Sequence, residues 1–151
     1  MKNLVIGLLL LGCALSVSAA DDSDTFKTLY EKEWSFRLQE YPRLAGEMGA
    51  EKPAHRLTRV SQADQDRRHA FYVSLEGELQ ALSCERLERT ECINYQIFGN
   101  QVRQFIEDHE NRAYLVPFNS DWGFYMSLAR LPQETDFTDF ESYADYLATL
   151  E

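Results

Sequence analysis

The three histidines are the first candidates for acid–base or metal chemistry. They are His55, His69 and His109, and imidazole is both a proton carrier near neutral pH and a common ligand of zinc. No two of them stand four residues apart, the spacing at which one helix face presents two ligands, and the sequence HExxH is absent. We therefore interpret each histidine as a surface or half-buried residue.

Other signatures of catalysis are also missing from the sequence. It contains neither a G-x-S-x-G nucleophile motif nor a glycine-rich phosphate loop. Acidic residues are numerous, but most fall on the polar faces of predicted helices, where solvation explains them. We predict no catalytic residue, no metal ligand and no cofactor held by this chain.

An aromatic-rich segment, residues 112–132, offers the best candidates for a binding site. Its sequence is RAYLVPFNSDWGFYMSLARLP, with a central Asn-Ser-Asp-Trp-Gly turn. Asn and Asp can turn the chain by bonding its own backbone, and glycine tolerates a positive φ. We therefore take Asn119, Trp122 and Gly123 as candidate substrate contacts. The simpler alternative is that the aromatic residues only pack the helices together.

The N-terminus predicts export from the cytoplasm. Residues 1–19 contain a basic start, an apolar stretch and small residues ending at Ala19, which is the layout of a secretory signal. The apolar stretch is shorter than the ~20 residues that span a bilayer. We predict cleavage after Ala19 and a periplasmic or secreted protein. The alternative is a lipobox ending at Cys13, which would make the product a membrane-anchored lipoprotein.

The two cysteines outside this segment, Cys84 and Cys92, are candidates for a disulfide, which an exported compartment permits. A continuous helix would hold their Cα atoms about 12 Å apart, too far for a bond. A bridge therefore requires a loop between them, and Thr90, as a predicted helix start, allows one. The alternative is two buried, unpaired thiols.

The charge of the chain bears on its partners. The 151 residues have a formal net charge of −10, and loss of Lys2 with the signal would make it −11. An acidic chain repels phosphate backbones and anionic lipid surfaces, so we predict no nucleic-acid partner. The charges alternate with apolar residues, which is typical of a folded surface, and the length after the signal fits about one domain.

The hydrophobic periodicity predicts an all-α fold with four amphipathic helices. The predicted helices run from about Ser23 to Glu40, from Ser61 through Leu82, from Thr90 to about Ala113, and from Thr138 to the last residue. A short helical turn, Arg43 to Met48, is predicted after the first. The predicted buried stripes are Phe26, Leu29, Tyr30, Glu33, Trp34 and Arg37; Ala63, Ala70, Phe71, Ser74, Leu75 and Leu82; Ile93, Ile97, Phe98, Gln101, Val102 and Phe105; and Phe140, Tyr143, Ala144, Leu147 and Leu150.

The last predicted helix has no stop signal. Neither a capping glycine nor a basic cluster follows its apolar residues, and the sequence ends within the pattern. We therefore expect the chain to be the N-terminal fragment of a longer protein, with residues 20–151 forming part of a helical domain. The alternative is a complete small helical periplasmic protein that binds a peptide or another partner.

Several motifs in series resemble one bacterial protein family. They are EWxFRLxExP at 33–42 followed by Ala45 and Gly49, Arg56-Leu57 before Ser61, INY at 93–95, YLxPxN at 114–119, Gly123, Leu131-Pro132, Phe137-Thr138 and YxxYL at 143–147. In this order they resemble the N-terminal region of the domain of unknown function 885 family, over about Phe26 to the end.

The resemblance implies a longer, mostly helical, exported protein that resembles zinc-dependent peptidases. In such proteins an HExxPGH-type motif supplies zinc ligands and the general base, and peptides are the substrates. This sequence contains none of that motif. The resemblance therefore implies zinc for the full-length family and assigns no catalytic or metal residue to this chain.

Overall fold

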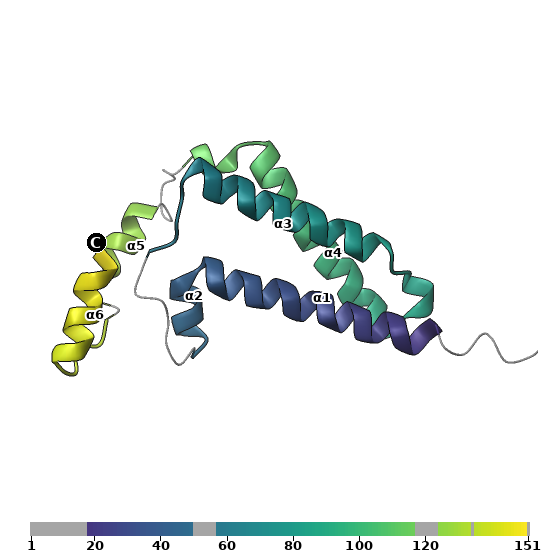
Figure 1. Ribbon diagram of the computed structural model, residues 1–151, viewed down its shortest axis with the longest axis horizontal. Helices are drawn as coiled ribbons and strands as arrows, with labels where there is room; N and C mark the ends of the chain where they lie inside the picture. The colour runs from purple at the N-terminus through teal and green to yellow at the C-terminus, as the bar shows by residue number, and fades with distance from the viewer. Residues whose placement is uncertain (1–17, 50–56, 117–123, 134, 151) are drawn as a thin grey trace, which may run out of the picture.

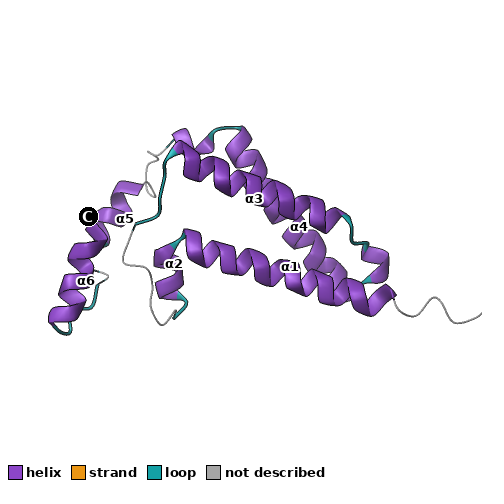
Figure 2. Cartoon of the chain, viewed as in Figure 1, coloured by secondary structure: helices purple, strands orange, loops and turns teal. Residues whose placement is uncertain are grey.

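The structure, a computed structural model, describes residues 18–49, 57–116, 124–133 and 135–150, and within these ranges the fold is all-α, as predicted (Figures 1 and 2). No strand occurs in the described ranges. The helices are α1 (Ser18–Glu40), α2 (Pro42–Glu47), α3 (Gln62–Gln80), α4 (Arg89–Glu110), α5 (Phe124–Arg130) and α6 (Phe140–Leu150), with the short 3-10 helices η1 (Cys84–Arg86) and η2 (Ala113–Leu115).

The structure differs from the prediction at the start of the first helix and within the aromatic-rich segment. The first helix begins at Ser18, so the predicted cleavage after Ala19 falls in its first turn, and Cys13 lies outside the described residues. A helix, α5, also lies within residues 112–132, where the sequence analysis placed a turn and no helix. Its sequence, FYMSLAR, is rich in good helix formers and stands between Gly123 and Pro132, which explains both its presence and its short length.

Side-chain caps fix the starts of α3, α4 and α6. The Ser61 hydroxyl accepts a hydrogen bond from the Asp64 backbone N–H at 3.2 Å, at the helix start predicted from the sequence. The Glu91 carboxylate accepts one from the backbone N–H of Glu88 at 3.4 Å, so α4 begins slightly before Thr90. The Asp139 carboxylate accepts one from the Ser142 backbone N–H at 2.8 Å and starts α6.

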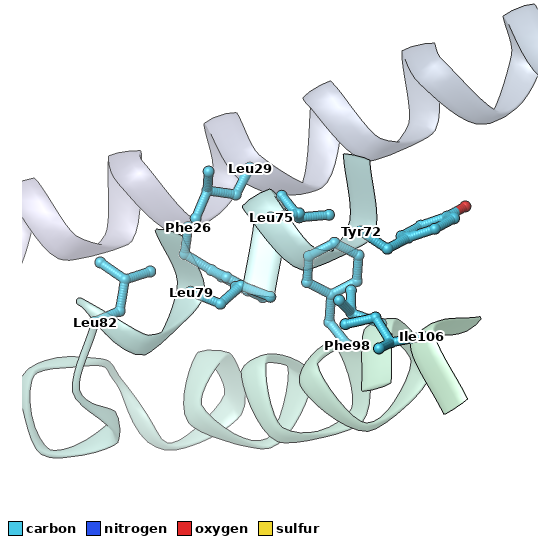
Figure 3. Close-up of a cluster of buried hydrophobic side chains, with 9 residues drawn as sticks. Phe26, Leu29, Tyr72, Leu75, Leu79, Leu82, Phe98 and Ile106 are labelled. Atoms are coloured by element: carbon cyan, nitrogen blue, oxygen red, sulfur yellow. The ribbon is translucent and has the colours of Figure 1, made fainter. Parts of the chain in front are cut away.

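Helices α1, α3 and α4 lie side by side and form the core of the molecule (Figure 1). Helix α3 runs antiparallel to both neighbours, and the α3–α4 pair makes the most extensive contact. Leu75 of α3 and Val102 of α4 are completely buried. The core side chains, drawn in Figure 3, are Phe26, Leu29, Tyr72, Leu75, Leu79, Leu82, Phe98, Val102 and Ile106.

The buried face of α3 is rotated relative to its predicted stripe. On α3, the residues Ala63, Ala70 and Ser74 are exposed, and the face that packs is formed by Arg68, Tyr72, Leu75 and Leu79. Helix α3 packs against both α1 and α4, so its buried face is set by two neighbours rather than by its own hydrophobic pattern.

A disulfide joins Cys84 and Cys92, whose Cα atoms are 4.9 Å apart. Cys84 lies in η1 and Cys92 in the first turn of α4, so the chain between them leaves one helix and enters the next. This is the interruption that the predicted bridge required. The disulfide fixes the connection between α3 and α4.

Reduction of this disulfide is expected to lower the free energy of unfolding by about 2.5 kcal/mol, because the bond restricts an eight-residue loop in the unfolded chain. Urea denaturation followed by circular dichroism, with and without a phosphine reductant, measures the difference. A Cys84→Ser/Cys92→Ser double variant should be insensitive to the reductant. Equal stability of the oxidised and reduced protein would contradict the expectation.

Candidate functional site

The substrate contacts predicted from the sequence cannot be placed on the fold. Asn119, Trp122 and Gly123 lie outside the described residues, as does His55. Their assignment therefore stays a prediction.

Two histidines that are far apart in the sequence meet at one end of the α3–α4 pair. The rings of His69 and His109 stack with their centroids 4.2 Å apart and their planes 16° from parallel. His109 Nε2 lies 3.0 Å from the Asp66 carboxylate, and His69 Nε2 lies 3.9 Å from the Glu110 carboxylate. The His109–Asp66 contact is at hydrogen-bond distance and links α4 to α3, whereas the buried His69 Nε2 has no hydrogen-bond partner among the described residues.

The residues around this histidine pair also hold η2. The Tyr114 ring lies 5.4 Å from the His109 ring, and the Tyr114 hydroxyl is 3.1 Å from the Gln62 amide nitrogen. Hydrogen bonds from Gln62 and then from His109 hold the pKa of Asp66 below its usual range. The cluster therefore anchors the chain where it leaves α4.

The described residues do not fit the zinc ion that the resemblance implies for the full-length family. Stacked imidazoles direct their lone pairs side by side, whereas zinc needs ligands that converge on one point. Within the described ranges, no group of three or more His, Cys, Asp or Glu side chains is arranged to hold a metal ion. No step through zinc is assigned to these residues.

A second polar cluster lies where α1 meets α3. Arg67 makes two hydrogen bonds to the Glu40 carboxylate, and Arg68 donates a third at 3.1 Å. Glu40 and Arg68 are buried, and Arg68 also donates to the backbone carbonyl of Arg59 at 2.9 Å. Two turns earlier on α1, Glu33 accepts hydrogen bonds from Arg37 and from the Tyr72 hydroxyl, at 2.8 and 3.2 Å. Each carboxylate in this cluster is paired with an arginine of the same cluster. We therefore interpret the cluster as structural.

Acid is expected to weaken the fold through Glu40. Hydrogen bonds from Arg67 hold the pKa of Glu40 below its ordinary value of 4.5, against the opposing effect of burial. A carboxyl group with a lowered pKa in the folded state stabilises the protein above its unfolded pKa and loses that contribution as the pH falls. The free energy of unfolding should therefore decline below about pH 4.5, measured by urea denaturation at several pH values. A Glu40→Gln variant should show a flatter acid limb, and an unchanged limb would contradict this.

A shallow groove runs between α1 and α4 and has a volume of about 520 Å³. Phe26 and Phe98 form its floor, and Tyr30 and Ile97 line its apolar walls. Tyr30 and Ile97 are 54% and 60% exposed, although the sequence predicted both as buried. Helices α1 and α4 make limited direct contact with each other. The packing of the three helices therefore covers only part of the apolar stripe on each of these two helices.

The largest departure from a buried stripe is on α6. Phe140, Tyr143, Leu147 and Leu150 recur at spacings of three and four and share one face of the helix. They are 84%, 49%, 45% and 50% exposed, respectively. Among the described residues, α6 makes no extensive contact with α1, α3 or α4. We call these four side chains the α6 stripe.

The sequence identified the α6 stripe as apolar but missed its exposure, because periodicity does not reveal whether another element covers a face. It missed the histidine pair because only the antiparallel packing of α3 and α4 brings His69 and His109 together. The sequence signal nearest to that pair was the predicted Cys84–Cys92 disulfide, which ties the end of α3 to the start of α4.

Comparison of the chain with protein-family models, curated proteins and solved structures found no match. The family resemblance therefore stays a prediction from the sequence motifs. Within the described part of the chain, no helix is long and apolar enough to cross a membrane.

Proposed function

We propose that this chain is a non-catalytic helical module of an exported protein and that it works by binding another polypeptide through the α6 stripe. The observation that carries the proposal is the exposure of four large apolar side chains on one face of an amphipathic helix. Scattered exposed apolar residues are ordinary, whereas a contiguous apolar face marks a site of association.

The energetics favour such association. Burying one large apolar side chain contributes about 1.5 to 3 kcal/mol, so a partner that covers part of the α6 stripe gains a useful binding energy. A helix that presents anchors at i, i+3 and i+7 is also the form in which one polypeptide commonly enters an apolar groove on another.

The family resemblance gives this proposal a more specific form. In that form, the chain is the N-terminal part of a metallopeptidase-like protein, and the polypeptide bound by α6 is its catalytic part. The zinc ligands and the general base would then belong to residues outside this chain, where zinc would polarise the scissile carbonyl of a peptide substrate.

Replacement of the α6 stripe is expected to leave the fold of the bundle intact. In a Phe140→Gln/Leu147→Gln variant, the free energy of unfolding should change by less than about 1 kcal/mol, because both side chains are exposed before and after the change. Urea denaturation followed by circular dichroism measures it. A loss of several kcal/mol would mean that the stripe packs within the chain.

Site-specific photo-crosslinking tests the binding function. A photoreactive residue at Leu147 should crosslink one defined polypeptide in the cells that produce this protein, identified by mass spectrometry. The same residue at Ala70, an exposed position on α3, is the control. Crosslinking of the same species from both positions, or of nothing from Leu147, would reject the proposal.

A further inference from the structure

The segment closed by the disulfide carries two side chains that hold the start of α1. Arg86 lies in η1 and donates a hydrogen bond from Nε to the Asp22 carboxylate at 2.6 Å. Glu91 lies in the first turn of α4 and accepts a hydrogen bond from the Ser23 hydroxyl. The start of α1 therefore packs against the connection between α3 and α4, which the disulfide fixes (Figure 1).

The Asp22 carboxylate is sensitive to the position of Arg86. Asp22 is 8% exposed, and its carboxylate is paired with the Arg86 guanidinium. A buried carboxylate that loses its cationic partner is strongly destabilising, and Asp22 can regain water only if the start of α1 moves away from the bundle. Arg86 itself is 43% exposed, so it can be hydrated without any such movement. Loss of this ion pair therefore acts mainly on α1.

The 3-10 helix η1 has little structure of its own to hold Arg86 in place. It consists of three residues, and helices of this kind have weak hydrogen-bond geometry. Its backbone bonds run from Arg86 to Ser83 and from Leu87 to Cys84, at 2.9 and 3.3 Å. The disulfide ties η1 to the first turn of the long helix α4. Without this bond, the conformational entropy of the chain favours other arrangements of η1.

The second half of α1 is held by contacts that do not involve the disulfide. Glu33 accepts a hydrogen bond from the Tyr72 hydroxyl of α3, and Glu40 pairs with Arg67 and Arg68 of the same helix. These residues lie two to four turns away from Asp22 along α1. A change at η1 is therefore expected to affect the start of α1 and to leave its second half in place.

We infer that the Cys84–Cys92 disulfide is a redox-sensitive switch for the packing of the start of α1. While the disulfide is intact, Arg86 stays against Asp22 and α1 packs from its beginning. When the disulfide is reduced, η1 loosens, Asp22 loses its counter-charge and the first turns of α1 leave the bundle. This inference concerns α1 rather than the α6 stripe, so it is independent of the proposed function.

Reduction would also open the groove between α1 and α4. Ser23 and Glu91 line one end of this groove, and Phe26 forms part of its floor. Phe26 is 8% exposed, and its ring packs edge-on against the rings of Tyr95 and Phe98 of α4. If the first turns of α1 leave the bundle, this aromatic contact is lost and the floor becomes accessible to water. The switch thus converts a change of redox state into exposure of apolar surface.

The reductant that operates the switch is a dithiol. One of its thiolates attacks a sulfur of the disulfide and forms a mixed disulfide, and its second thiol then displaces the remaining protein sulfur. The dithiol becomes a disulfide, and its two protons and two electrons pass to the sulfurs of Cys84 and Cys92. Neither cysteine is fully buried, which suits this exchange.

Hydrogen–deuterium exchange followed by mass spectrometry tests the switch. The whole chain is compared in its oxidised form and after reduction with dithiothreitol, without urea. We expect exchange at residues 22–29 to become about tenfold faster on reduction, and exchange at residues 33–40 to change by less than about threefold. Reoxidation should restore the slow exchange at residues 22–29.

Two variants with the disulfide intact test whether Arg86 carries the effect. In Arg86→Ala, exchange at residues 22–29 should be about as fast as in the reduced protein, and reduction should then add little, because both changes remove the same contact. Arg103→Ala is the matched control. It removes an arginine of α4 that is 56% exposed and lies 3.7 Å from Glu76 of α3, so exchange at residues 22–29 should stay slow.

Several outcomes would overturn the inference. Equal acceleration of exchange in all helices, or loss of most of the helical circular dichroism on reduction, would mean that the disulfide stabilises the whole fold rather than the start of α1. Unchanged exchange at residues 22–29, either in the reduced protein or in oxidised Arg86→Ala, would overturn it as well. None of these measurements involves α6, so crosslinking at Leu147 decides the proposed function separately.

Discussion

Replacement of Glu40 by alanine is expected to lower the free energy of unfolding by about 3 kcal/mol, because it leaves a buried arginine without its counter-charge. The Arg68 side chain is only 7% exposed and would keep one hydrogen bond, to the carbonyl of Arg59. Arg67 is 47% exposed, so its guanidinium can be hydrated when Glu40 is replaced. The loss in the free energy of unfolding is therefore expected at the lower end of the usual range for a broken buried pair. Urea denaturation at pH 7 measures the change.

Two further variants separate loss of the ion pair from general damage to α1. Glu31→Ala removes a carboxylate that is 65% exposed on the same helix and pairs weakly with Lys27, so it should cost well under 1 kcal/mol. Glu40→Leu/Arg68→Met replaces the buried pair by apolar groups and should recover much of the lost stability. If the double variant is as unstable as Glu40→Ala, the pairing does not explain the effect.

How far the sequence predicts this fold depends on the kind of interaction. Local signals were sufficient for the starts of two helices: Ser61 caps α3 through Asp64, and Pro42 begins the short α2. These features depend on residues only a few positions apart. The all-α class follows from them directly.

The arrangement of the side chains depends on contacts between distant residues, and it was predicted less well. Ile97 and Phe98 are neighbours in one predicted stripe, yet Phe98 is 4% and Ile97 60% exposed. The difference arises because α3 covers one edge of the α4 stripe and α1 covers little of the other. Arg68 is the opposite case, a charged residue that is buried although arginine is usually exposed. Its burial is explained by its partner Glu40, which lies 28 residues away in the sequence.

In the candidate site too, local features could be predicted from the sequence and features that depend on distant contacts could not. The apolar periodicity of α6 could be read from the sequence, whereas its exposure depends on what else the chain packs there. The resemblance to a peptidase-like family rests on motifs whose most specific part includes Asn119 and Gly123, outside the described residues. The stripe on α6 therefore carries the functional proposal.

Replacement of Leu75 by alanine is expected to lower the free energy of unfolding by about 3 to 4 kcal/mol. Leu75 is 0% exposed and stands on α3 between the side chains of α1 and α4 (Figure 3). Alanine would leave a cavity lined by residues of all three helices, which the rigid helix pairs could close only in part. Urea denaturation followed by circular dichroism measures the loss, and a Leu75→Met variant should lose less than about 1.5 kcal/mol.

Leu147→Ala on α6 is the matched control, because it makes the same chemical change within a similar amphipathic pattern. Leu147 is 45% exposed, so its replacement should change the free energy of unfolding by less than about 1 kcal/mol. Its effect should appear instead when the partner of α6 binds, as a weaker complex. Replacement by alanine would then cost different amounts of stability at two leucines with similar sequence patterns. Leu75 is covered by other parts of the chain, whereas we propose that another polypeptide covers Leu147. Equal losses of stability at the two positions would contradict this division.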